Sequence, residues 1–149
     1  ESIPYFRKAI EKQTWKNPNP YHGECYYNLG LALHMTGQDD EAFDAFYKAT
    51  WSYENQSSGY YWLACLSCRK GDYQAALGFI EQSMIRNWHN MKARTLKAAI
   101  LRALNKDTVL LLSESADIDP LDMGIRYEKA LPQEIWQTGN RLPSSSIIT

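Results

Sequence analysis

The sequence predicts an all-α protein built from repeated pairs of antiparallel helices. Two segments, residues 26–49 and 60–83, share one pattern of small and bulky positions although their chemistry differs. Within each segment the apolar residues recur at spacings of three and four, which is typical of amphipathic helices. Positions of the pattern also recur with a period of 34 residues: Gly30, Ala64 and Ala98 form one series, and Gly37, Gly71 and Asn105 form another. A period of this length indicates a repeated helix–turn–helix unit.

The repeated positions have roles in packing. The small residues of the first series let a neighbouring helix approach closely, and Ala42 and Ala76 do the same from the second helix of each unit. Phe46 and Ile80 are expected to fill the space between hairpins. Since packing constrains volume more than chemical type, the units keep a size pattern while their sequences diverge.

The turn between the two helices of a unit has its own signals. Gly37 and Gly71 are expected to end the first helix, because the residue after a helix often needs a positive φ that glycine adopts without steric cost. Asp39 or Asp40 in one unit, and Asp72 in the next, are expected to cap the second helix by accepting hydrogen bonds from its free N–H groups.

We expect one domain over residues 1–149, made of the following elements in chain order. Residues 1–16 are predicted to be the second helix of a truncated repeat, with Pro4 in the first turn. The following elements are a proline-rich link at 17–22, full repeats at 23–56 and 57–90, a repeat with a short turn at 91–122, a half-repeat helix at 123–131 and a C-terminal extension at 132–149. Pro120 falls two residues early against the period, so we infer a deletion in the turn at 105–108, which places Leu112 in the bulky position. Half-repeats at both ends favour a fragment of a larger protein.

The repeated residues resemble those of the tetratricopeptide repeat family. In one unit they are Tyr26, Leu29, Gly30, Gly37, Ala42, Phe46 and Ala49, and in the next they are Tyr60, Leu63, Ala64, Gly71, Ala76 and Ile80, with Ser83 in place of the last alanine. The resemblance implies a right-handed superhelix, an α-α solenoid of antiparallel helix hairpins, whose concave groove binds a peptide or another domain. It therefore implies a non-catalytic scaffolding module.

A narrower resemblance gives an alternative function. The phrases NPNPYHGECYYNLGLAL, AFYKATWS and DIDPLDMG are similar to the repeat region of large multidomain bacterial proteins that carry a domain of unknown function, with carbohydrates as its expected substrates. This resemblance implies an accessory region of a multidomain, carbohydrate-active enzyme. Such a region would position the catalytic domain or set the oligomeric state.

The family's inner-face positions give candidate groove residues. The first full unit contributes Glu24, Tyr27, Asn28, Leu31 and His34; the second contributes Tyr61, Trp62, Cys65, Cys68 and Arg69; and the third contributes Lys92, Thr95, Leu96, Ala99 and Arg102. The resemblance implies a groove that is aromatic and apolar toward its N-terminal side and basic toward its C-terminal side.

Some members of the family clamp the terminal carboxylate of a peptide with five polar residues. Only Lys92 fits that set here, since Tyr27, Leu31, Trp62 and Leu96 occupy the other positions. We therefore reject the clamp. Flat aromatic side chains favour a hydrophobic peptide or a domain surface as the partner. The alternative interpretation is that these rings pack between neighbouring hairpins.

The residues that suggest chemistry are few and scattered. Cys65 and Cys68 form a CxxC, but a zinc site needs four ligands and the usual second CxxC is missing, so two small apolar packing residues are the simpler interpretation. The three histidines are dispersed, and none of the common nucleophile, metalloprotease or phosphate-binding motifs occurs. The sequence thus predicts no enzyme, no cofactor and no metal site.

Charge and composition limit the partners. The formal net charge is −1, whereas nucleic acids and anionic membranes require a basic surface. No apolar run reaches the length of a transmembrane helix. Three cysteines do not form an even set, which favours reduced thiols and a cytoplasmic location. The expected partner is a protein, a peptide or another domain of the same parent chain, and the open repeat ends are compatible with a homo-oligomer.

Overall fold

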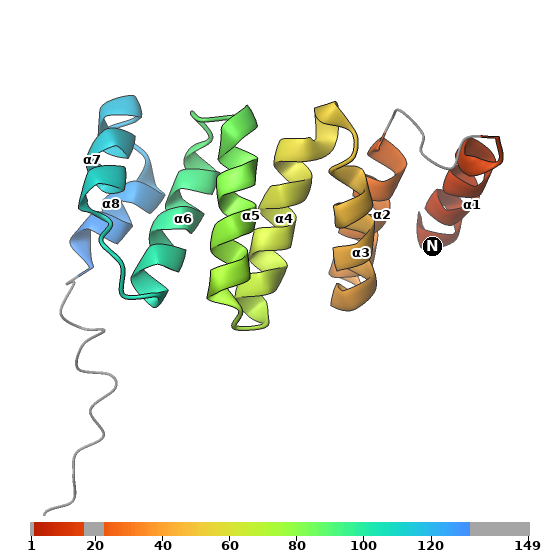
Figure 1. The fold of residues 1–149 in the computed structure, drawn as a ribbon, viewed down its shortest axis with the longest axis horizontal. Helices are drawn as coiled ribbons and strands as arrows, with labels where there is room; N and C mark the ends of the chain where they lie inside the picture. Colours follow the sequence, from red (N-terminus) through yellow and green to blue (C-terminus); the bar gives the residue numbers. More distant parts are fainter. Residues whose placement is uncertain (1, 17–22, 132–149) are drawn as a thin grey trace, which may run out of the picture.

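The computed structural model describes residues 2–16 and 23–131, which form eight α-helices, one short 3₁₀ turn and no strand (Figure 1). The helices are α1 (Ser2–Thr14), α2 (Glu24–Met35), α3 (Asp39–Ala49), α4 (Gln56–Arg69), α5 (Tyr73–Arg86), α6 (Met91–Ala103), α7 (Val109–Ile118) and α8 (Met123–Ala130), with the 3₁₀ turn η1 at Tyr53–Asn55. The protein is therefore all-α across this part of the chain. The predicted link at 17–22 and the extension at 132–149 lie outside the described residues.

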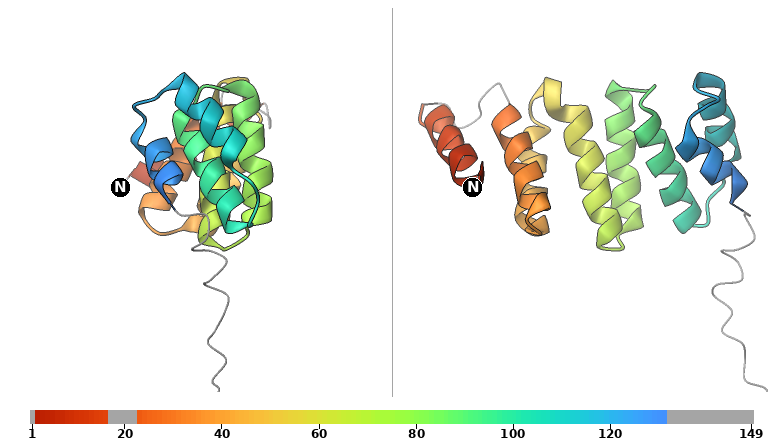
Figure 2. Two further views of the ribbon diagram at one scale, coloured as in Figure 1. Left: turned by 90° about the vertical axis from the view of Figure 1, so that its left-hand side faces the viewer. Right: turned by 180° about the vertical axis from the view of Figure 1, so that it is seen from behind.

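The helices form a row of antiparallel hairpins (Figures 1 and 2). The hairpins are α2–α3, α4–α5 and α6–α7, and each second helix also packs against the first helix of the next unit. Helix α1 packs against α2, while α8 packs against both α6 and α7. The additional contacts of α6 with α4 and α8 place these first helices side by side. Their shared face is the part of the fold that positions the candidate site.

The turns confirm the predicted role of the glycines. Gly37 and Gly71 both have a φ of +79°, and Asn105, at the equivalent position of the third hairpin, has a φ of +53°. Asparagine is one of the few non-glycine residues that adopt this conformation readily. Each residue ends the first helix of its hairpin and lets the chain reverse.

Gly71 and Gly78 provide a matched pair for testing this conformational requirement. A Cβ atom would have no neighbour within 4 Å at either glycine, but only Gly71 has a positive φ. We expect Gly71→Ala to lower the free energy of unfolding by about 1 kcal/mol. Gly78→Ala, inside α5, should raise it by ~0.5–1 kcal/mol. Urea unfolding measures both, and destabilisation of similar size by the two substitutions would contradict the account.

One of the two predicted helix caps is wrong. Asp72 precedes α5, and its side chain accepts a hydrogen bond from the Ala75 backbone N–H at 2.9 Å, as predicted. In contrast, α3 begins at Asp39, and Gln38 occupies the cap position without a side-chain cap bond. The Asp39 carboxylate instead contacts neighbouring helices, through His34 at 2.8 Å and Arg69 at 3.1 Å. These tertiary partners replace the local cap.

The third hairpin also differs from the prediction. Residues 104–108 separate α6 from α7, whereas 36–38 and 70–72 separate the helices of the first two hairpins, so this connection is longer than the others. The Asp107 carboxylate accepts from the Val109 N–H at 2.9 Å, which fixes the late start of α7. The shortening of this repeat, predicted for the turn, therefore falls on α7, which has 10 residues. Leu112 is buried, in keeping with its assignment to the bulky position.

The core follows the small and bulky positions of the repeat. Gly30, Ala64 and Ala98 are all buried, and a Cβ atom at Gly30 would lie only 2.7 Å from the Phe46 ring. Phe46 and Ile80 are both fully buried. Ser83, which replaces the last alanine of the pattern, donates to the backbone oxygen of Ser57 at 2.7 Å, so its hydroxyl is satisfied in the core.

A buried arginine interrupts the aromatic series of the repeat. Arg94 lies 34 residues after Tyr60 and is 0% exposed. Its guanidinium covers the Trp88 ring at 4.7 Å and donates to Ser115 Oγ at 2.7 Å. It also donates to the backbone oxygen of Trp88 at 3.3 Å and to the Glu114 carboxylate at 3.1 Å. Arg94 therefore joins α6 to α7 where the earlier hairpins have tyrosine.

Candidate functional site

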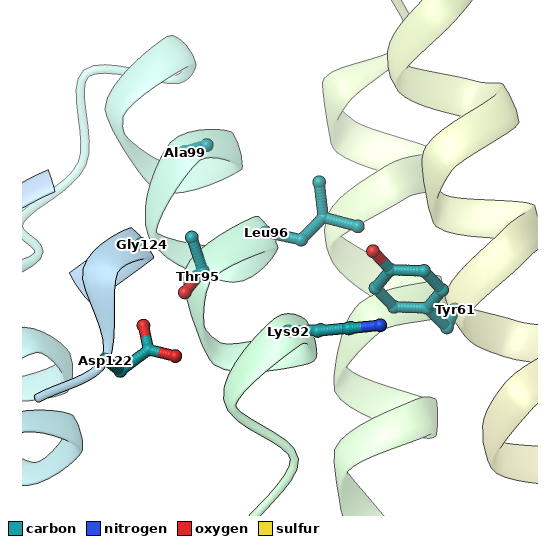
Figure 3. Close-up of a pocket in the computed structure, with 7 residues that line it drawn as sticks. All are labelled: Tyr61, Lys92, Thr95, Leu96, Ala99, Asp122 and Gly124. Carbon is teal, nitrogen blue, oxygen red and sulfur yellow. The ribbon is translucent and has the colours of Figure 1, made fainter. Parts of the chain in front are cut away.

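Two adjoining cavities lie on the face shared by α2, α4, α6 and the start of α8. The larger, of about 390 Å³, is lined by Tyr61, Lys92, Thr95, Leu96, Ala99, Asp122 and Gly124 (Figure 3). The smaller, of about 260 Å³, is lined by Tyr27, Ser58, Tyr61, Trp62, Asn90 and Lys92. Tyr61 and Lys92 belong to both linings, so the two cavities adjoin at these side chains. We call the combined surface the first-helix groove.

Helical periodicity explains why these residues share a face. In α4, Tyr61 and Trp62 follow Ser58 by three and four positions. In α6, Thr95 and Leu96 follow Lys92 by three and four positions, and Ala99 follows Leu96 by three. Residues three and four apart lie on one side of a helix. The opposite side of α4 carries Leu63, Ala64 and Leu66, which are buried in the core. The same pattern that buries one side of each helix thus presents the other to the groove.

Aromatic rings form the N-terminal part of the groove. The Trp62 ring stacks on Phe46, with centroids 5.6 Å apart and an interplanar angle of 6°. Trp62 also donates from its indole N–H to the Tyr27 hydroxyl at 3.2 Å, and Tyr61 meets it edge-on at 6.0 Å. Tyr27 and Trp62 therefore join neighbouring hairpins, as the packing interpretation predicts, and both side chains also line the smaller cavity.

The polar groups of the two linings include an ammonium, four hydroxyls, an amide and a carboxylate. Lys92 is exposed and makes no hydrogen bond or ion pair with the described residues, and its side chain extends toward Tyr61 (Figure 3). Burial raises the pKa of Tyr61 to about 12, with a smaller contribution from Cys65, so its hydroxyl stays protonated at neutral pH. The lining carboxylate, Asp122, accepts from the Ile125 N–H at 2.8 Å and caps α8. The groove therefore offers an ammonium and neutral hydroxyls over an apolar surface.

Seven of the sequence-predicted residues line the groove, and the others lie elsewhere. Those in the groove are Tyr27, Tyr61, Trp62, Lys92, Thr95, Leu96 and Ala99; those outside both linings are Glu24, Asn28, Leu31, His34, Cys65, Cys68, Arg69 and Arg102. The prediction omitted Ser58, Asn90, Asp122 and Gly124. Ser58 lies one helical turn before Tyr61, so the helical period alone could have found it.

The predicted basic residues are engaged in ion pairs instead. Arg102 makes a two-pronged pair with Glu128 of α8, at 2.9 and 3.0 Å. Arg69 contacts Asp39 at 3.1 Å, and Asp39 also contacts His34 at 2.8 Å. The His34 ring in turn lies 5.1 Å from Trp62. These charges connect neighbouring helices and leave Lys92 as the basic side chain of the groove.

The cysteine pair shows no sign of activation. Burial raises the pKa of Cys65 to about 11, although a hydrogen bond from Tyr61 lowers it in part, and burial also raises the pKa of Cys68. The thiolate is the reactive form, so both sulfurs stay protonated and weakly nucleophilic near neutral pH. Across residues 2–16 and 23–131, no three His, Cys, Asp or Glu side chains gather in a way that would hold a metal ion.

Among the described helices, none combines the length and apolar character needed to cross a membrane. No protein-family model matches the sequence.

Proposed function

We propose that the chain is a non-catalytic protein-interaction module of the tetratricopeptide-repeat type, which binds an extended peptide or a domain surface in the first-helix groove. The groove itself is the observation that carries this proposal. Its two cavities run across three successive hairpins and share Tyr61 and Lys92, so they suit an elongated partner better than a compact small molecule. Stacked hairpins commonly present extended binding surfaces of this kind.

The lining supports recognition of protein rather than catalysis. Aromatic rings supply contact area with little loss of conformational entropy, and Tyr61 and Trp62 are fixed by packing on their own helix and on Phe46. A catalytic site usually gathers a nucleophile, a base and groups that stabilise developing charge. The residues that line the two cavities include no histidine or cysteine, and the His34–Asp39 pair lies outside both.

The geometry of the hairpins supports the proposed family. The positive φ angles at Gly37, Gly71 and Asn105 repeat every 34 residues, and the small and bulky core positions keep the same period through the first two hairpins. A right-handed superhelix of such units would place the first helix of each hairpin on its inner face. The first-helix groove would then be that inner face.

A blocking substitution tests the groove without disturbing the core. Peptides would be selected from a phage-displayed library of random dodecapeptides on the immobilised chain, and their affinities measured by fluorescence anisotropy. Ser58 is exposed, and Ser58→Arg would fill the smaller cavity. We expect it to weaken binding at least about ten-fold, which corresponds to ~1.4 kcal/mol.

The matched control is Gln82→Arg, which adds the same charge to the exposed surface of α5 outside the groove. It should leave the affinity unchanged, and both variants should retain the circular dichroism spectrum of the unmodified chain. Selection of no peptide, or equal binding to Ser58→Arg, would reject the proposed function.

A further inference from the structure

We infer that the first-helix groove selects a peptide that carries an internal acidic side chain next to an apolar one, with the carboxylate on Lys92 and the apolar group against Tyr61 and Leu96. This inference rests on the proposed function and specifies the chemistry of the partner. Three features of the groove support it: the unpaired charge of Lys92, the hydroxyls that can donate to a peptide and the apolar lining.

Lys92 differs from other basic residues near it. Lys97 pairs with Glu81 at 3.0 Å, Arg102 pairs with Glu128, and Arg69 pairs with Asp39. The Lys92 ammonium makes no such pair with the described residues, although Lys92 lines both cavities. Asp122 is the lining carboxylate, but it caps α8, and the Lys92 side chain points away from it toward Tyr61 (Figure 3). An anionic group from the partner would complete this charge.

The remaining polar groups suit the same partner. Tyr27 already accepts from Trp62, so its O–H remains as a donor, and the Ser58 and Thr95 hydroxyls add further donors along the lining. The backbone carbonyls and a carboxylate of an extended peptide supply the matching acceptors. Hydrogen bonds to an ionised group are stronger than those between neutral groups, so an acidic residue gains more here than its amide counterpart.

The apolar lining fixes the neighbour of the acidic residue. In the larger cavity, Leu96 and the Tyr61 ring form a half-buried surface beside Lys92, and Ala99 extends it further along α6 (Figure 3). An apolar side chain next to the acidic one can occupy this cavity while the carboxylate stays on the ammonium. The carboxylate is expected to belong to a side chain and not to a peptide C-terminus. Of the five polar residues with which some tetratricopeptide repeats clamp a terminal carboxylate, only Lys92 is present.

The dodecapeptide selection tests the inference directly, because displayed peptides joined to the coat protein at their C-termini have no free terminal carboxylate. We expect the selected peptides to be enriched in Asp or Glu beside an apolar residue. Changing that Glu to Gln should weaken binding to the unmodified chain about five-fold, as expected for one partly exposed ion pair. The difference in affinity between the Glu and Gln peptides should become smaller at high salt, because salt screens the ion pair.

Lys92→Met identifies the residue responsible, with Lys106→Met as its control because Lys106 is exposed and outside the groove. On Lys92→Met the Glu and Gln peptides should bind equally, whereas on Lys106→Met the five-fold difference should remain. Two results would overturn the inference and leave the proposed function standing. In the first, the selected peptides lose binding to Ser58→Arg but show no preference for an acidic residue. In the second, the Glu peptide still binds Lys92→Met more tightly than the Gln peptide. Failure to select any groove-binding peptide would overturn both.

Discussion

Phe46→Ala is expected to lower the free energy of unfolding by about 3–5 kcal/mol, the usual cost of removing a buried phenylalanine ring. The ring is fully buried, stacks on Trp62 of the next hairpin and meets Tyr27 edge-on at 5.8 Å. On the side of Gly30 the ring meets a residue that has no side chain to fill the space left by its removal. The substitution therefore opens a cavity between two hairpins.

Urea unfolding followed by circular dichroism measures this loss. The control is Tyr47→Ala at the next position of α3, where the side chain is 48% exposed. Exposed substitutions usually change stability by less than about 0.5 kcal/mol. Comparable destabilisation by the two variants would show that Phe46 does not join the hairpins as described.

Arg94→Ala is expected to cost about 3 kcal/mol, because it removes a buried side chain and its contacts with α7. The guanidinium contacts Trp88, Glu114 and Ser115, all of which lose a partner. Glu114 remains part-exposed, with 45% of its side chain accessible, and Ser115 still donates to the Leu111 backbone oxygen. Most of the cost should therefore come from lost volume and from the uncovered Trp88 ring.

Arg94→Met separates volume from hydrogen bonding. Methionine fills much of the same space without charge, and the Glu114 carboxylate that loses its partner is part-exposed and can be solvated by water. We expect Arg94→Met to recover at least about half of the loss caused by Arg94→Ala. Equal unfolding midpoints for the two variants in urea would instead assign the stability to the hydrogen bonds.

The sequence predicts the turns and core well because these depend on local or repeated constraints. A positive φ restricts the residue type at Gly37 and Gly71, and close packing against Phe46 restricts Gly30. Asp39 shows where local rules fail: its carboxylate resembles a cap, but His34 and Arg69 from neighbouring helices bind it. A local pattern does not record which distant side chains compete for the same group.

The third hairpin shows a signal that the sequence contains but that is easily missed. Arg94 occupies the position of Tyr26 and Tyr60 in the 34-residue period, which marks it as a core position despite its charge. Within the groove, the inner-face positions of the tetratricopeptide repeat family correctly predict residues of α4 and α6 such as Tyr61 and Thr95, because helical spacing fixes which residues share a face. The same family positions also predict Arg102 in the groove, but Arg102 pairs with Glu128 of α8 instead. This pair becomes visible only once the packing of α8 against α6 is known.

The most direct test of the central claim is to locate a bound peptide on the chain. A selected dodecapeptide would be added to the isotopically labelled protein, and the backbone amide chemical shifts compared with those of the free chain by NMR. If the peptide occupies the first-helix groove, the largest changes should fall on the α4 and α6 residues that line it, including Tyr61, Thr95 and Ala99. Changes centred on the exposed surfaces of α3, α5 and α7 would contradict the central claim.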